Sequence, residues 1–313
     1  MTTLDITTIA FPTEALRDRI AELVPASDRE DLDLVVWSAE EPDADPQTLD
    51  AVVLNYLSAP ATVARLAEAP NLKLLQVQTT GYDVVTGYLD ELAVASGAGA
   101  HADATAELAV GLALARLRGI DDAARDMLTG SWNHSQHRSL VDRKTMIIGV
   151  GGIGEGIRAR LEPFGVDITR VGTRARTDEH GPIHATAELP ELLPDTEIVI
   201  LITPLTDSTR HLVDKDFLSR LPDGALIVNV ARGQVVDTDA LVAELESGRL
   251  QAALDVVDPE PLPADHPLWK TPNTLVVPHL GGNTDAFTPR IEKILAEQVR
   301  RIQRGDELLN QVN

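Results

Sequence analysis

Residues 146–154 read Met146-Ile147-Ile148-Gly149-Val150-Gly151-Gly152-Ile153-Gly154, an apolar run that leads into the pattern Gly-x-Gly-x-x-Gly. When a strand precedes this pattern and a helix follows it, each glycine has a physical role. Gly149 permits the tight turn, Gly151 lets a pyrophosphate approach the backbone, and Gly154 lets the helix pack closely on the strand. The amino terminus of the helix then offers free N–H groups to the phosphates. The stretch therefore predicts a dinucleotide-binding loop, in which Gly152 and Ile153 also take part.

Short β-branched apolar runs alternate with helix-like stretches along the whole chain. This alternation indicates parallel sheets covered by helices, and therefore an α/β protein. The length of 313 residues is about right for two domains. The expected strands occupy residues 32–37, 51–54, 72–77, 145–149, 167–171, 198–202, 225–230, 252–257 and 274–277. The expected helices occupy residues 13–23, 60–67, 104–128, the stretch from the glycine-rich loop to residue 164, 238–246 and 284–304.

The two series of strands and helices predict two lobes. A Rossmann-type doubly wound parallel sheet is expected in a dinucleotide-binding domain of residues 99–281. A flavodoxin-like substrate domain is expected from both chain ends, residues 1–98 and 282–313. The long helix, for which Asp103 is the candidate N-cap, would cross from the first lobe to the second. The terminal helix would return to the first lobe.

The charge and composition of the chain narrow its possible partners. The 49 acidic and 27 basic residues give a formal net charge of −22. This charge disfavours nucleic acids and anionic membrane surfaces, although a local basic site can still hold a small anionic substrate. The chain has no cysteine, which excludes disulfides and cysteine-bound metals, and no metal site is expected. Because it lacks a signal-like start and an apolar run of about 18 residues, a cytoplasmic protein is expected.

The end of the strand after the glycine-rich loop should select the cofactor. NAD-type sites carry Asp or Glu at this position, where the carboxylate bonds the ribose 2′-hydroxyl. This chain instead has Thr173, Arg174 and Arg176, whose hydroxyl and guanidinium groups can hold a 2′-phosphate. The sequence therefore predicts NADP as the preferred cofactor, with NAD possible. The alternative interpretation is that both arginines are solvated surface residues.

Arg232, Glu260 and His279 each come shortly after one of the last three expected strands. Ligands of open α/β sheets lie beyond the carboxyl ends of the strands, so these side chains are expected to converge. In carbonyl reduction a protonated His279 can donate the proton, and Glu260 would favour its charged form. Arg232 can bind the carboxylate and carbonyl oxygen of a substrate. Each residue alone could be structural, but together they favour catalysis.

Several motifs in the same order resemble the D-isomer-specific 2-hydroxyacid dehydrogenase family, over nearly the whole chain. They are the glycine-rich loop, Thr203-Pro204-Leu205-Thr206, Ile227-Val228-Asn229-Val230-Ala231-Arg232-Gly233, Ala253-Leu254-Asp255-Val256, Glu260-Pro261 and Pro278-His279. The resemblance implies Arg232 as substrate binder, Glu260 as partner of the histidine and His279 as acid and base.

The resemblance also implies roles for residues that spacing alone does not single out. Thr203, Pro204 and Ala231 would line the cofactor, and Asp255 would contact the nicotinamide amide. Thr80 and Gly81 would belong to a first-lobe loop whose backbone N–H groups receive the substrate carboxylate. Members of the family usually dimerise through the cofactor lobe, so a homodimer is expected.

We therefore expect a 2-keto acid reductase that transfers a hydride between NADPH and a small acid of the glyoxylate or hydroxypyruvate type. Two alternatives remain. One is an NADH-dependent dehydrogenase of a bulkier or phosphorylated 2-hydroxy acid, and the other is a dinucleotide-sensing binding protein without turnover. Relatives commonly carry Asn and other polar residues before the crossing helix. Residues 95–101 are mostly small here, which leaves the substrate contacts of that edge unassigned.

Overall fold

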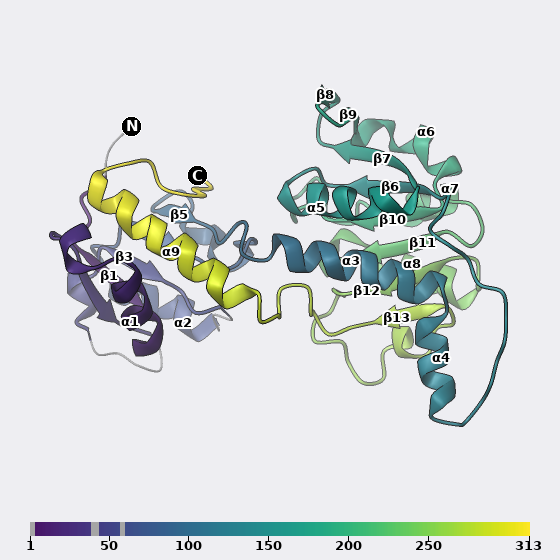
Figure 1. Cartoon of the computed structure of the whole chain (residues 1–313), viewed down its shortest axis with the longest axis horizontal. Coiled ribbons are helices and arrows are strands. Elements are labelled where there is room, and N and C mark those ends of the chain that lie inside the picture. The colour runs from purple at the N-terminus through teal and green to yellow at the C-terminus, as the bar shows by residue number, and fades with distance from the viewer. Residues whose placement is uncertain (1–3, 39–43, 57–59) are drawn as a thin grey trace. The chain divides into compact units, whose positions relative to one another are not determined.

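The computed structural model describes residues 4–38, 44–56 and 60–313, and the chain folds into two compact units (Figure 1). Unit 1 comprises Met1–His101 and Asp285–Asn313, and unit 2 comprises Ala102–Thr284. The chain therefore passes from one unit to the other twice. The expected domain boundaries, after residues 98 and 281, each lie three residues before these passages.

Unit 1 is built on a parallel sheet of five strands in the order β2-β1-β3-β4-β5. This is the flavodoxin-type order, which confirms the expected fold of this part. The apolar sides of α1 and α9 pack together on one face of the sheet, so the carboxyl-terminal helix completes a core begun by the amino-terminal strands (Figure 1). The helices and strands are β1 (Thr8–Phe11), α1 (Glu14–Leu23), β2 (Asp33–Val36), β3 (Ala51–Val53), α2 (Pro60–Ala64), β4 (Leu74–Gln76), β5 (Ala93–Ala95) and α9 (Phe287–Arg304).

Unit 2 is built on a sheet of eight strands in the order β13-β12-β11-β10-β6-β7-β9-β8. Seven of them run parallel in the Rossmann order, and only the edge strand β8 is antiparallel, which confirms the doubly wound fold. The elements are α3 (Ala102–Leu117), α4 (Ile120–Met127), β6 (Lys144–Ile148), α5 (Gly152–Leu161), β7 (Asp167–Gly172), β8 (Arg176–Asp178), β9 (Gly181–Ala185), α6 (Leu189–Leu192), β10 (Ile198–Leu201), α7 (Lys215–Arg220), β11 (Leu226–Asn229), α8 (Thr238–Glu246), β12 (Gln251–Leu254) and β13 (Thr274–Val276).

The central strand β10 shows why this sheet needs helices on both faces. Successive side chains of a strand point to opposite faces. Ile198 and Ile200 enter the core formed with α3 and α5, whereas Val199 and Leu201 enter the core formed with α6, α7 and α8. All four side chains are fully buried. A continuous apolar run therefore becomes a parallel strand covered from both sides.

The expected single helix over residues 104–128 is wrong. The chain forms two helices, α3 and α4, because Gly119 between them adopts a left-handed conformation with φ 62°, which a continuing α-helix does not allow. The buried Arg116 near the end of α3 pairs with Asp121 and Asp122 at the start of α4. Asp103 is not the N-cap either. It lies inside the first turn of α3, where its carboxylate bonds Arg160 of α5 at 2.9 Å.

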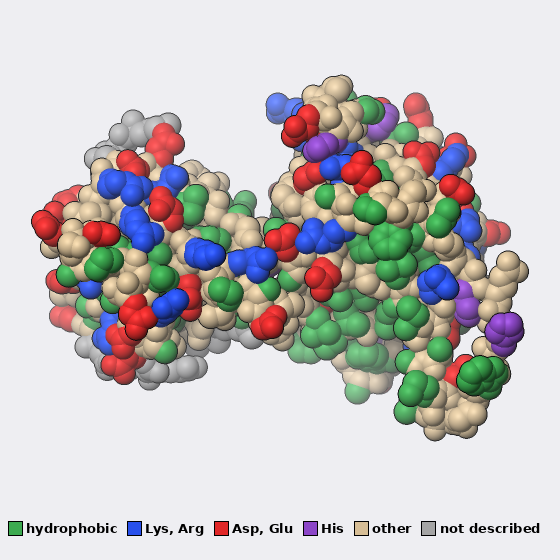
Figure 2. Space-filling model, viewed as in Figure 1, with side chains coloured by type: hydrophobic (Ala, Val, Ile, Leu, Met, Phe, Trp, Pro, Cys, Tyr) green, Lys and Arg blue, Asp and Glu red, His purple; other side chains and the backbone are tan. Residues whose placement is uncertain are grey.

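The surface of the described chain is rich in carboxylates, and Figure 2 shows acidic side chains over both units. Every described helix is too short or too polar to traverse a lipid bilayer. The described residues also contain no group of three or more His, Asp or Glu side chains arranged to hold a metal ion.

Candidate active site

The site residues of unit 2 lie where its parallel strands end. Because those strands run in the same direction, their carboxyl ends share one edge of the sheet. From β13 to β7, the residues that follow the successive strands are His279 after β13, Asp255 after β12, Ala231 and Arg232 after β11, Thr203 and Pro204 after β10, Gly149–Gly154 after β6, and Thr173 and Arg174 after β7. The sheet therefore places in spatial order a set of residues that are scattered along the sequence.

The glycine-rich loop has the geometry of a phosphate cradle. Gly149 has φ 120°, and a Cβ added to it would lie 2.2 Å from the carbonyl oxygen of Ile202. A Cβ on Gly154 would lie 1.9 Å from the carbonyl oxygen of Gly149, so α5 packs directly against the turn. At Gly151 and Gly152 an added Cβ would meet no atom within 4 Å. The outer side of the loop is therefore open, and the N-terminus of α5 has no side-chain cap. These features fit a dinucleotide pyrophosphate.

His279 and Glu260 form a close pair. The Nδ1 atom of His279 lies 2.5 Å from Oε1 of Glu260, and both side chains are partly exposed. The hydrogen bond to Glu260 raises the pKa of His279 above its ordinary value, with burial opposing the shift. The charge of Asp255 raises this pKa further, while the positive charge of Arg232 lowers it. The opposite ring nitrogen, Nε2, is the one left to meet a substrate.

Asp255 accepts three hydrogen bonds from the loop that carries His279. The backbone carbonyl oxygen of Asp255 accepts the N–H of His279 at 2.9 Å. Its carboxylate accepts the next two N–H groups, those of Leu280 at 2.6 Å and Gly281 at 3.1 Å. His279 has φ 51°, a left-handed conformation that is uncommon for a residue with a side chain. Three consecutive hydrogen bonds to Asp255 thus stabilise the backbone that aims the imidazole.

Asp255 is buried, and its environment is tuned to hold the loop. Burial raises the pKa of Asp255, whereas the N–H groups of Leu280 and Gly281 oppose this rise by stabilising the charged carboxylate. On the other side of the loop, the Thr105 hydroxyl of α3 donates to the carbonyl oxygen of Gly281 at 3.1 Å. A Cβ on Gly281 would lie 2.8 Å from a carboxylate oxygen of Asp255. Glycine at this position therefore fits the space between Thr105 and Asp255.

Arg232 is placed by a turn that the buried Asn229 holds. The Asn229 side chain accepts the N–H of Ala231 at 3.1 Å and donates to the carbonyl oxygen of Arg232 at 3.0 Å. The next residue, Gly233, passes so close to the segment after β12 that a Cβ would lie 1.9 Å from the carbonyl oxygen of Val257. Asn229, Gly233 and Thr105 are not among the site residues predicted from the sequence. The only sequence signal for Asn229 and Gly233 is their place in the motif of residues 227–233.

The expected 2′-phosphate residues lie beside the glycine-rich loop. Thr173, Arg174 and Arg176 are exposed, and within the described chain neither arginine forms an ion pair. A Cβ on Gly172 would lie 3.0 Å from the Val150 side chain and 3.5 Å from Nη1 of Arg176. The guanidinium of Arg176 is therefore close to the turn between Gly149 and Gly151.

Thr80 and Gly81 lie in unit 1, in the loop that follows β4. The Thr80 hydroxyl is buried and has no hydrogen-bond partner among the described residues. Buried hydroxyls are generally paired. The neighbouring Thr79 hydroxyl donates to the carbonyl oxygen of Gly81 at 2.5 Å, which shapes the turn.

The Rossmann sheet, the open glycine cradle and the histidine–carboxylate pair at the same sheet edge define a nicotinamide-dependent oxidoreductase. Comparison with known proteins gives the family. Residues 110–281, more than half of the chain, match the model of the D-isomer specific 2-hydroxyacid dehydrogenase, NAD binding domain. The chain belongs to the D-isomer-specific 2-hydroxyacid dehydrogenase family.

Three relatives illustrate the similarity. Human glyoxylate reductase/hydroxypyruvate reductase is 30% identical over 322 aligned residues, covering 95% of this chain and 98% of the relative. The crystal structure of a D-isomer specific 2-hydroxyacid dehydrogenase from Xanthobacter autotrophicus, in complex with NADPH and MES, is 28% identical with a TM-score of 0.82 and 98% of each chain covered. An NADPH-dependent glyoxylate/hydroxypyruvate reductase from Sinorhizobium meliloti, in complex with NADP and malonate, is 25% identical with a TM-score of 0.79, covering 98% of this chain and 97% of the relative.

The contacts of Asp255 predict the effect of Asp255→Asn. The amide has one acceptor oxygen in place of two, so the N–H of Leu280 or Gly281 loses its partner, at a cost of about 1–3 kcal/mol. Movement of the loop that relieves this cost displaces His279. We expect kcat for keto acid reduction to fall about 10- to 100-fold. The control is Asp239→Asn on the exposed side of α8, which should keep wild-type turnover. A folded Asp255→Asn variant with full turnover would contradict this role.

Proposed function

We propose that the protein reduces a small 2-keto acid, of the glyoxylate or hydroxypyruvate type, to the D-2-hydroxy acid with NADPH. The observation that carries the proposal is the pair of His279 and Glu260, 2.5 Å apart at the sheet edge that also holds Arg232 and the glycine-rich loop. A carboxylate that raises the pKa of an imidazole extends the pH range over which the proton donor is charged. A protein that only sensed dinucleotides would not need such a donor.

The proposed reaction assigns one task to each residue. When bound, a dihydronicotinamide would supply the hydride for the carbonyl carbon of the keto acid. Protonated His279 donates its Nε2 proton to the carbonyl oxygen, and Glu260 stabilises the charged ring through Nδ1. Arg232 binds the substrate carboxylate and stabilises the negative charge that develops on the carbonyl oxygen. In unit 1, Thr80 and Gly81 are proposed as substrate-binding residues, and the Thr80 hydroxyl is buried without a hydrogen-bond partner among the described residues.

The preference for NADPH is supported by the exposed side chains after β7. No carboxylate follows this strand at the position where an acid would bond a ribose 2′-hydroxyl. Arg174 and Arg176 form no ion pair within the described chain, so both guanidinium groups can pair with a 2′-phosphate. Two of the related structures contain NADPH or NADP, which agrees with this cofactor.

Steady-state assays with both cofactors test the proposal. NADPH oxidation is followed with glyoxylate, hydroxypyruvate, pyruvate, and longer or phosphorylated keto acids. We expect the highest kcat/KM for glyoxylate or hydroxypyruvate, and a preference for NADPH over NADH of about 10-fold or more, which corresponds to ~1.4 kcal/mol. Equal or better efficiency with NADH would contradict the cofactor choice. A clear preference for a bulky or phosphorylated acid would contradict the substrate class, and cofactor binding without turnover of any acid would favour the sensor alternative.

The His279–Glu260 pair predicts a pH dependence. Reduction needs protonated His279, so kcat/KM falls as the pH rises through the raised pKa of this residue. In Glu260→Gln the negative charge is lost and the pKa falls, so the decline should begin at lower pH than in the wild type. The measurement is kcat/KM for keto acid reduction against pH. His279→Ala should lower turnover by ~100-fold and abolish the decline of kcat/KM at high pH. An unchanged profile in Glu260→Gln would remove Glu260 from the proposed role.

We also propose a homodimer formed through unit 2. Its support is an apolar surface on α4 and the segment that follows, visible as green side chains around α4 (Figure 2). Exposed apolar side chains that gather in one region mark an association site, and a second copy offers the same surface across a two-fold axis. The large apolar side chains exposed on α4 and on the segment between α4 and β6, with their exposed fractions, are Ile120 57%, Met127 80%, Leu128 87%, Trp132 94% and Val141 55%.

Light scattering after gel filtration tests the dimer. We expect the mass of two chains of 33.7 kDa for the wild type. The double variant Leu128→Ser/Trp132→Ser should have the mass of one chain, because the apolar contact is lost. Val84→Ser, at an exposed apolar residue of unit 1, is the control and should leave the dimer intact. A wild-type monomer at micromolar concentration would contradict the proposal.

A further inference from the structure

The edge strand β8 has no apolar anchor. Its three residues, Arg176, Thr177 and Asp178, are all exposed, and it pairs only with β9, in the antiparallel direction. Strands of this length gain little stability from pairing alone. The position of β8, and with it the position of Arg176, must therefore depend on polar contacts.

Arg170 of β7 supplies those contacts. Its side chain is buried, and its Nη1 and Nη2 atoms donate to the two carboxylate oxygens of Asp178 at 2.8 and 2.6 Å. The Nη2 atom also donates to the carbonyl oxygen of Gly181, at 2.8 Å, where the hairpin turns into β9. The two-branched hydrogen bond to Arg170 lowers the pKa of Asp178 to about 2. Bidentate pairs of this kind fix geometry as well as charge.

The ion pair closes a loop around the expected 2′-phosphate residues. Arg170 and Asp178 are eight residues apart in sequence, and Thr173, Arg174 and Arg176 all lie between them. The loop therefore starts in the buried sheet, passes the cofactor edge and is fastened back to the sheet. A closed loop has fewer conformations before a ligand binds. Binding the ligand therefore costs less conformational entropy.

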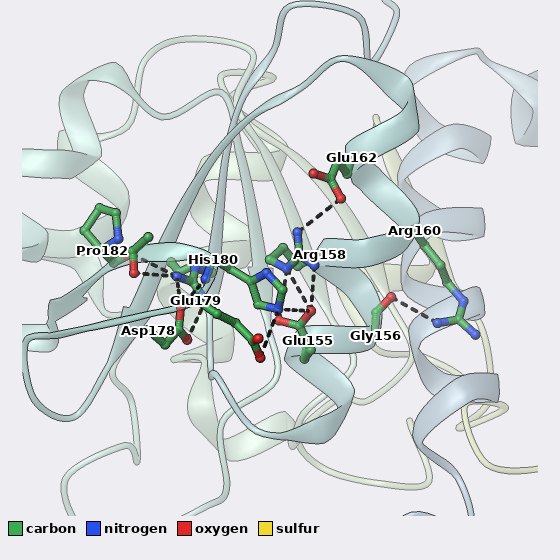
Figure 3. A network of polar contacts seen from close by, with 11 residues as sticks. Glu155, Gly156, Arg158, Arg160, Glu162, Asp178, Glu179, His180 and Pro182 are labelled. Carbon is green, nitrogen blue, oxygen red and sulfur yellow. Dashed lines mark hydrogen bonds and ion pairs between the residues drawn. The ribbon is translucent and has the colours of Figure 1, made fainter.

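A second contact joins the tip of the hairpin to the helix of the glycine-rich loop. His180 Nε2 lies 3.3 Å from Oε1 of Glu155 in the first turn of α5, as the close view shows (Figure 3). Glu155 is also bonded by Arg158, one turn further along α5, which lowers the pKa of this carboxyl. The hairpin is thus tied to both β7 and α5.

We propose that the Arg170–Asp178 ion pair is a clamp that positions Arg174 and Arg176 for the 2′-phosphate of NADPH. Asp178 is then a positioning residue and touches no ligand. The inference rests on the proposed choice of NADPH. The direction of the change in phosphate affinity distinguishes the clamp from a simple charge effect. The Asp178 carboxylate repels a phosphate, so removal of this carboxylate would strengthen phosphate binding if charge alone mattered. If positioning matters, its removal weakens phosphate binding.

Calorimetric titration with 2′,5′-ADP and 5′-AMP tests the clamp, because the two nucleotides differ by the 2′-phosphate. In the wild type we expect 2′,5′-ADP to bind more tightly than 5′-AMP. In Asp178→Ala we expect this preference to fall about 10-fold, through weaker binding of 2′,5′-ADP and with 5′-AMP changed less than about twofold. Asp216→Ala, which removes an exposed aspartate paired with Arg220 on α7, is the matched control and should keep the wild-type preference.

Asp178→Asn separates positioning from charge. Its amide oxygen can still accept one hydrogen bond from Arg170, so we expect a preference between those of the wild type and Asp178→Ala. A pure charge effect predicts the same preference for 2′,5′-ADP in Asp178→Asn and Asp178→Ala, because each substitution removes one negative charge. Equal preferences in the two variants would overturn the clamp. The same readout applies to Arg170→Lys, which keeps the charge but loses the two-branched contact, and a fall in preference is expected there too.

The titrations also distinguish failure of the clamp from failure of the proposed NADPH preference. If the wild type prefers 2′,5′-ADP and Asp178→Ala keeps or increases that preference, the clamp is wrong and the choice of NADPH stands. If the wild type does not distinguish the two nucleotides, the choice of NADPH is wrong and the clamp falls with it.

Discussion

The three hydrogen bonds that Asp255 accepts are the contacts on which the proposed chemistry depends. A parallel sheet brings the ends of β11, β12 and β13 to one edge, but it does not decide where a side chain in the following loop points. The backbone oxygen and the carboxylate of Asp255 take the N–H groups of residues 279–281. They hold His279 in a conformation that an isolated loop would rarely adopt. Glu260 can therefore act on the protonation of an imidazole that is already in place.

The residues that the sequence identifies well are those whose role is local. The glycines at 149, 151 and 154 lie within one strand–turn–helix segment. The polar residues after the later strands follow short apolar runs rich in β-branched residues, a pattern typical of buried strands. The sheet then brings these residues together, because all its parallel strands end at the same edge. The strands β1 and β5 of unit 1 were not predicted. Alanine, a weak strand former, makes up one of the four residues of β1 and two of the three residues of β5. Asp50, whose carboxylate accepts the N–H groups of Thr7 and Thr8, helps to hold β1.

Other features depend on contacts that no local pattern reveals. Helical spacing continues through Gly119, and only the left-handed conformation there, together with the pairing of Arg116 with Asp121 and Asp122, divides α3 from α4. The β8–β9 hairpin lacks the apolar alternation that marks a strand. Its position depends on a guanidinium in β7 that meets Asp178 only after folding. Asp178 had no visible role in the sequence because its partner lies on a different strand.

A chain with net charge −22 would have to bind an anionic acid and a polyphosphate cofactor. The pairing of the acids around the sheet edge explains how it can do so. Glu260 is bonded to His279, Asp255 to backbone N–H groups, Asp178 to Arg170, and Glu155 to Arg158. Each such carboxylate is offset by a donor in direct contact, whereas charges on distant surfaces are screened beyond about 8–10 Å at ordinary ionic strength. Arg232, Arg174 and Arg176 then set the local potential, so an acidic surface and an anion-binding edge are compatible in one molecule.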